Sequence, residues 1–161
     1  GIPDVSVTIK LRSGRFHQSF YESAIARIFD GVPHQIAQNE PLAELYPVAD
    51  IVVSNYSTAT LEALQCGKPV VYFGVSPGFN LMADVHLKPY EQEGAVSIAK
   101  TSEAFARVLQ TLIRDPQARE RMSRAATDFL KKNFAFDGRA GERAAELITS
   151  LASSARRHTV S

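Results

Sequence analysis

The chain has 161 residues, of which 45% are hydrophobic and 22% charged, and this is the composition of an ordinary globular domain. Its formal net charge of +1 gives no support for binding to nucleic acid or to an acidic membrane surface. A single cysteine, Cys66, excludes an internal disulfide and a cysteine-based metal cluster. No apolar run has the length of a membrane span and no signal peptide is apparent, so we expect a cytoplasmic protein. We also expect it to need neither a metal nor a cofactor.

The first part of the chain predicts two strands and two helices. The alternating, β-branched run Val5–Leu11 predicts a strand, which ends in a turn with two arginines at residues 12–15. Residues 17–29 carry apolar side chains at helical spacing. A short strand is expected at residues 34–37, and Pro41 is well placed to open a second helix that continues to about residue 49.

The segment Ala49–Gly74 predicts one β-α-β unit. An apolar strand begins at Ile51 and leads into the polar turn Ser54–Thr58. A short helix then runs to Cys66, which we expect to be buried, and a second apolar strand ends at Gly74. A polar turn between a strand and a helix is where open α/β sheets bind ligands, because backbone N–H groups converge there and suit a phosphate.

The last part of the chain predicts one strand and three helices. The polar segment 75–93 is long enough to indicate a functional loop. Residues 95–99 predict a strand, and apolar stripes then predict three helices at about 102–113, 118–133 and 139–151. Residues 153–161 form a small polar tail, which we expect to be flexible.

This order of elements predicts an α/β fold, with a Rossmann-like parallel sheet of about five strands and helices on both faces. We expect one domain at residues 1–152, followed by the tail. The tight Gly-x-Gly-x-x-Gly turn is missing after the first strand, which argues against a dinucleotide redox role. The abrupt opening, Gly1-Ile2-Pro3, suggests a piece of a longer chain.

The run ELYPVADIVVSNYSTATLEALQCGKPVVYFG resembles the donor-binding half of glycosyltransferases with two facing Rossmann-like domains, the GT-B fold. The shared features are an Ala-Asp before an apolar strand, a Ser-rich turn, Glu-Ala-Leu on the next helix and Gly-Lys-Pro-Val-Val. The sequence is more similar still to bacterial polysaccharide and teichoic-acid type transferases, including CDP-glycerol glycerophosphotransferases. These also carry an Asp-Gly followed by an Arg, matched here by Asp137-Gly138 and Arg143.

The resemblance covers about Val5 to Leu151 and implies one half of a GT-B fold. It implies that the chain binds a nucleotide-diphosphate donor of the UDP, CDP or GDP type. The transferase would move a sugar or glycerophosphate group in cell-surface polysaccharide synthesis, in the cytoplasm or at the inner face of the membrane. The acceptor would be held by an N-terminal domain absent from this chain, so we expect the piece alone to be inactive.

Four residues of the β-α-β unit are candidates for donor binding. Ser57, Thr58 and Thr60 supply more hydroxyls than one helix N-cap requires, which favours contact with a diphosphate over capping alone. The resemblance implies that Glu62 binds the ribose, since a carboxylate accepts hydrogen bonds from neighbouring hydroxyls. Without the resemblance, Glu62 would be read as part of a solvated helix face.

Four further candidates precede this unit. Lys10 and Arg12 flank the end of the first strand, where a cation would offset negative charge on a departing nucleotide diphosphate without a metal ion. They could also be ordinary solvated cations. The resemblance implies that backbone groups near His34 and Ile36 contact the base.

Two departures from the relatives leave the catalytic residues unassigned. Many retaining members carry two Glu residues separated by seven others. Glu62 matches the second, but the first would fall at Ser54. Teichoic-acid type relatives often have Lys-x-His-Pro after the first strand, where this chain has Arg12, so whether Arg12 replaces a catalytic His is open. Asp137 is expected to cap the last helix or to belong to an interdomain surface.

Two other functions remain open. The same half-domain plan occurs in UDP-N-acetylglucosamine 2-epimerases, although the further acidic residues that such an enzyme needs are not apparent. The chain could also be a non-catalytic Rossmann-like interaction module.

Overall fold

The computed structural model describes residues 5–11, 18–29, 31–55, 57–74, 81 and 83–158. The chain divides into two compact units, Gly1–Pro47 and Val48–Ser161. Arg12 lies outside the described residues. No helix of the described ranges is long and apolar enough to cross a membrane.

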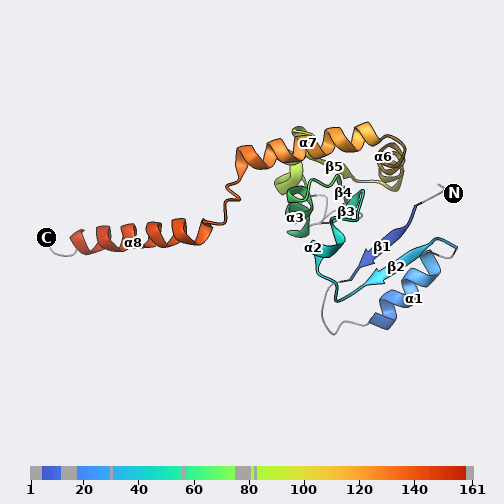
Figure 1. Cartoon of the computed structure of the whole chain (residues 1–161), viewed down its shortest axis with the longest axis horizontal. Helices are drawn as coiled ribbons and strands as arrows, with labels where there is room; N and C mark the ends of the chain where they lie inside the picture. The colour runs from blue at the N-terminus through green and yellow to red at the C-terminus, as the bar shows by residue number, and fades with distance from the viewer. Residues whose placement is uncertain are drawn as a thin grey trace. The chain divides into compact units, whose positions relative to one another are not determined.

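Unit 1 contains a two-stranded parallel sheet. Strands β1 (Val7–Lys10) and β2 (His34–Ala37) pair from Val7 opposite His34 to Lys10 opposite Ala37, and helix α1 (Gln18–Ile28) connects them (Figure 1). Helix α2 (Leu42–Leu45) follows β2. It is shorter than predicted because Pro47 lies two residues beyond its end, and Pro41 stands at its N-cap rather than in its first turn.

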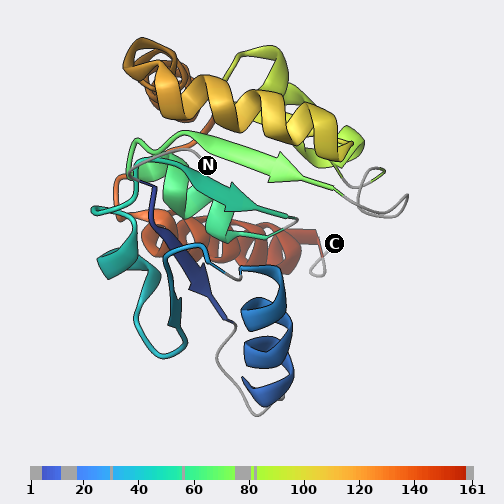
Figure 2. The same cartoon turned by 90° about the vertical axis from the view of Figure 1, so that its right-hand side faces the viewer.

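Unit 2 contains a three-stranded parallel sheet in the order β3 (Val52–Ser54), β4 (Val70–Phe73) and β5 (Val96–Ala99). The three strand arrows point in one direction in Figure 2. The central strand β4 is covered on both faces, and Val70, Val71 and Tyr72 have no exposed surface. A continuous apolar run is what such a doubly covered parallel strand requires.

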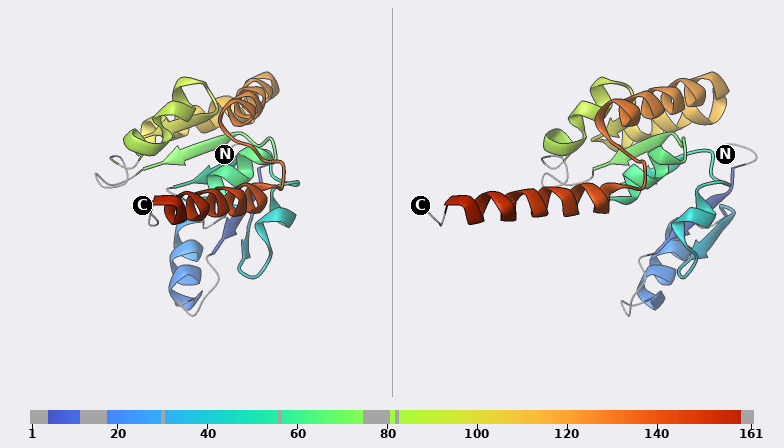
Figure 3. Two further views of the ribbon diagram at one scale, coloured as in Figure 1. Left: turned by 90° about the vertical axis from the view of Figure 1, so that its left-hand side faces the viewer. Right: turned by 60° about the vertical axis from the view of Figure 1, so that its left-hand side comes forward.

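Helices cover both faces of the unit 2 sheet. Helix α6 (Ser102–Arg114) packs on the face that includes Val71, and helix α7 (Pro116–Asn133) lies beside α6 (Figure 3). The opposite face, which includes Tyr72, is packed by the π-helix η1 (Ala83–Leu87) and helix α5 (Lys88–Gln92). Helix α3 (Ala59–Gln65) contacts β3, β4 and α7.

The prediction of an α/β, Rossmann-like fold with about five parallel strands and helices is therefore confirmed for the described part of the chain. Its five strands fall into a two-stranded and a three-stranded sheet. Three local expectations were wrong. Residues 83–92 of the segment 75–93, which we expected to be a loop, form η1 and α5. Cys66 is exposed, because it forms the C-cap of α3. Helix α8 (Ala140–His158) exposes Leu147, Ile148 and Leu151, although an apolar stripe at this helical spacing predicts a buried face.

Candidate functional site

The candidate site lies at the carboxyl edge of the unit 2 sheet. Strands β3, β4 and β5 are parallel, so their carboxyl ends meet at one edge, where open α/β sheets bind ligands. Ser54 ends β3, Gly74 follows β4 and Lys100 follows β5. The pairing of β4 with β5 extends to this edge, since the Gly74 N–H donates to the Ala99 carbonyl at 3.1 Å.

Two buried or half-buried hydroxyls support the polar turn from inside. The Thr60 hydroxyl donates to Ser54 Oγ at 3.2 Å, and the Ser54 hydroxyl donates to the Asn55 carbonyl at 2.8 Å. Only 2% of Thr60 is exposed, on the first turn of α3. The sequence grouped Thr60 with the donor-binding hydroxyls, and the structure places it beneath the turn, where it positions Ser54.

Two exposed hydroxyls lie on the outside of the same turn. Ser57 Oγ accepts a hydrogen bond from the Ala59 N–H at 3.2 Å. Thr58 occupies the N-cap position of α3, but its side chain makes no capping hydrogen bond. The Ser57 hydroxyl therefore binds the first N–H of α3, and the Thr58 hydroxyl beside it stays exposed.

Glu62 is exposed in the first turn of α3. It follows Thr58 by four residues, and residues at this spacing share one face of a helix. The arrangement brings a carboxylate and a hydroxyl together on the exposed side of the turn. It fits a ribose contact and a solvated helix face equally well.

Unit 1 holds the other group of predicted site residues. Lys10 Nζ donates to the carbonyls of Leu11 at 2.6 Å and Gln38 at 2.8 Å, which lie just beyond the ends of β1 and β2. Two of its three donors are thus used to tie the carboxyl ends of the two strands together. His34 opens β2 and is exposed, whereas Ile36 is half-buried opposite Ile9.

An ion pair joins η1 to the end of β5, and the sequence reasoning missed it. Lys100 Nζ lies 2.6 Å from Asp84 Oδ1, with both side chains nearly half exposed. The hydrogen bond from Lys100 lowers the pKa of Asp84, and the charges of Lys100 and Lys88 lower it further. The pair was missed because its members are 16 residues apart, although a π-helix is itself frequent at functional sites.

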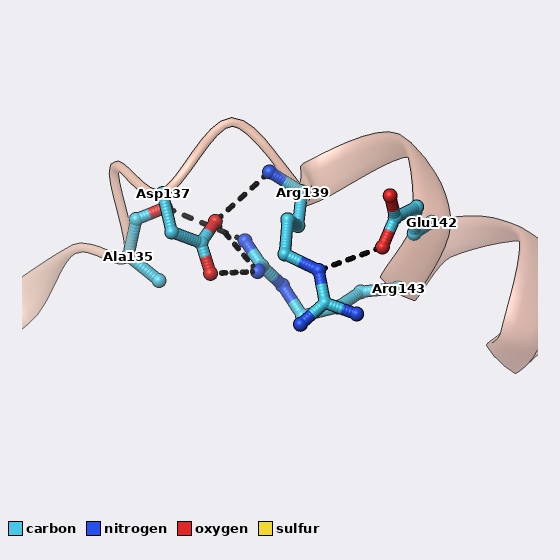
Figure 4. Close-up of polar contacts among 5 residues, drawn as sticks. All are labelled: Ala135, Asp137, Arg139, Glu142 and Arg143. Carbon is cyan, nitrogen blue, oxygen red and sulfur yellow. Dashed lines mark hydrogen bonds and ion pairs between the residues drawn. The ribbon is translucent and has the colours of Figure 1, made fainter.

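The Asp-Gly and Arg pattern near the end of the chain has a structural explanation (Figure 4). Arg143 Nη1 donates to both carboxylate oxygens of Asp137, at 2.8 and 2.7 Å. The Arg139 N–H also donates to Asp137 at 3.0 Å, at the start of α8. The bonds from Arg143 and then from Arg139 lower the pKa of Asp137. Asp137 therefore ties the residue before α8 to Arg143 in the first turn of that helix.

The described residues of this edge contain donors and acceptors suited to phosphates and hydroxyls. Among the residues that the structure describes, no group of three or more His, Cys, Asp or Glu side chains is arranged to hold a metal ion. A polar turn at the carboxyl edge of a parallel sheet is typical of α/β proteins that bind phosphorylated ligands.

Comparison with protein families identifies the class more closely. Residues 13–150 match the model of the family described as CDP-glycerol:poly(glycerophosphate) glycerophosphotransferase. The match spans most of the chain, and the chain belongs to this family of transferases. The predicted resemblance to CDP-glycerol glycerophosphotransferases is thereby confirmed. No match was found among curated proteins.

Proposed function

We propose that this chain forms the donor-binding part of a transferase whose donor is a nucleotide diphosphate, with CDP-glycerol as the first candidate. The observation that carries the proposal is the polar turn at the carboxyl end of β3, in a chain of the glycerophosphotransferase family. The full-length enzyme would hold the acceptor in a further N-terminal domain and work in the cytoplasm or at the inner face of the membrane.

The exposed hydroxyls would bind the diphosphate. Ser57 and Thr58 lie side by side in the sequence, and neither is buried. Their hydroxyls and backbone N–H groups can donate to phosphate oxygens, while the buried hydroxyl of Thr60 keeps the turn in shape through Ser54. Glu62, one helical turn further on, would accept hydrogen bonds from the ribose hydroxyls.

The residues of unit 1 would make separate contributions. Lys10 would supply positive charge at the carboxyl ends of β1 and β2, and Arg12 would add a bidentate donor for phosphate. Backbone groups near His34 and Ile36 would contact the base. The two hydrogen bonds that Lys10 already makes leave it one donor for a ligand.

The two kinds of group transfer release different products. In glycerophosphate transfer, an acceptor hydroxyl attacks the phosphorus that carries the glycerol, the bond to the bridging oxygen breaks, and CMP leaves with that electron pair. In glycosyl transfer the hydroxyl attacks the sugar carbon, and the whole nucleoside diphosphate leaves. A site for the first reaction must stabilise charge on the bridging oxygen between the two phosphates.

The test is a calorimetric titration of the 161-residue chain with CDP-glycerol, UDP-N-acetylglucosamine and a GDP-sugar. We expect CDP-glycerol to bind, and Glu62→Gln to weaken binding about tenfold while leaving the melting temperature unchanged. Glu146→Gln, an exposed glutamate on α8, is the matched control and should change neither.

Each other outcome has a defined meaning. Binding of UDP-N-acetylglucosamine in place of CDP-glycerol would favour an epimerase-like or glycosyl-transferring protein. Absence of binding by all three ligands at millimolar concentration would contradict the donor site and favour an interaction module.

A further inference from the structure

Lys100, at the carboxyl edge of the unit 2 sheet, is a cation to which the proposed function assigns no role. Lys100 follows β5, and Ser54 lies in register with Tyr72 on β4 and, through it, with Ile98 on β5. Neighbouring strands are about 4.8 Å apart, so β3 and β5 are about 10 Å apart. Lys100 therefore emerges from the same edge as Ser57 and Thr58, two strands away.

The polar turn itself has no positive charge. Residues 54–60 contain hydroxyl, amide and phenol groups but no Lys or Arg. A diphosphate bound there would carry at least two negative charges. Lys100 follows β5 at this edge, and its charge and that of Lys88 at the start of α5 both act on the carboxylate of Asp84. Asp84 is therefore under the influence of two ammonium groups.

The ion pair of Lys100 can be exchanged at small cost. Its side chains are 43% and 44% exposed, and exposed ion pairs contribute little to stability. The pair is also not the main anchor of η1, because Leu87 at the end of η1 is buried against Tyr72. Lysine has a flexible four-carbon stem and can turn its ammonium between neighbouring anions.

We propose that Lys100 is a further donor-binding residue, held by Asp84 in the free chain and transferred to the diphosphate when the donor binds. Asp84 is then a competitor for the same ammonium group, so it lowers donor affinity. This inference rests on the proposed function and adds a specific residue and a regulating anion to that site.

The test compares two substitutions for which the proposal requires opposite effects. Lys100→Met should weaken CDP-glycerol binding about tenfold, because a charge-assisted hydrogen bond is lost. Asp84→Asn should tighten binding about threefold, because it frees Lys100 for the ligand. The matched control is Lys132→Met, near the end of α7, which removes another exposed ion pair, of 2.7 Å, with Glu93. It should leave affinity unchanged.

The result that overturns the proposal is an Asp84→Asn affinity equal to or weaker than that of the unsubstituted chain. The affinity of Asp84→Asn tests the proposal even if Lys100→Met fails to fold. Lys100→Arg keeps the positive charge and should retain binding, which provides a second check. If the unsubstituted chain binds none of the nucleotides, the proposed function itself has failed. If it binds and Asp84→Asn does not tighten binding, only the role of Lys100 has failed.

Discussion

The two parallel sheets differ in how completely they are covered. In unit 2, all of the first three residues of β4 are buried, because α6 packs on one face and η1 and α5 on the other. In unit 1, β1 has no fully buried residue and β2 has one, Ala37. The polar turn after β3 therefore belongs to the better-covered sheet, whereas Lys10 lies on the less covered one. Sites on rigid elements hold their geometry better.

The substitution with the largest expected effect is Leu112→Ala, in the well-covered sheet of unit 2. Leu112 is 3% exposed on α6 and packs with Val71 and Ala99. Removing it leaves a cavity under the doubly covered strand, and we expect the free energy of unfolding to fall by about 3 kcal/mol. Urea denaturation followed by circular dichroism would measure the change. A loss below about 1 kcal/mol would mean that this face is loosely packed.

Ile25→Ala applies the same change to unit 1. Among the described side chains of α1, Ile25 is buried and most of the others are exposed. The surroundings can therefore relax into the space, and we expect a loss of about 2 kcal/mol, at the lower end of the usual range. A loss larger than that of Leu112→Ala, in the same assay, would reverse the order of the two units.

Thr60→Val tests whether the buried hydroxyl holds the polar turn. The substitution keeps the shape of the side chain but removes the donor to Ser54. We expect a loss of about 1 kcal/mol in the free energy of unfolding, together with faster hydrogen exchange at Asn55 and Ser57.

The control for Thr60→Val is Thr149→Val, because Thr149 donates to the Ala145 carbonyl on the exposed face of α8. It should cost less than about 0.5 kcal/mol. Equal effects of the two substitutions would show that burial of Thr60 does not matter to the turn.

The smallest expected effect is the pH dependence of the start of α8, which belongs to neither covered sheet. The pKa of Asp137 is lowered by its bond from Arg143 and then by that from the Arg139 N–H. Its stabilisation of α8 is therefore complete above the ordinary aspartate pKa of about 4 and is lost as the pH falls through the lower value. Far-ultraviolet circular dichroism should show helix loss in this acidic window.

Asp137→Asn should remove that pH dependence, because the titrating carboxylate is gone. The comparison variant is Asp128→Asn, an exposed aspartate on α7, which should retain it. If both variants keep the same helix loss, the ion pair with Arg143 does not control the start of α8.

Much of the local structure follows from the sequence by itself. Apart from η1 and α5, which lie in an expected loop, the order of strands and helices was predicted, because apolar periodicity and turn residues act over short distances. Gly67 adopts a φ of 66° at the end of α3, a conformation that glycine takes without strain, and Thr101 caps α6 by accepting from the Ala104 N–H. The Ser-rich turn was also predicted, because the strand before it and the helix after it are each recognisable from their own residues.

Tertiary structure alone decided which polar groups are free. Thr58 and Thr60 are alike in sequence, yet one is exposed and the other lies beneath Ser54. Lys100 and Asp84 meet only because β5 ends beside η1. The division of five strands into two sheets was also not predictable, because parallel pairing depends on residues distant in the sequence. Periodicity shows which side chains are apolar, and only the packing of distant elements decides which of them are covered.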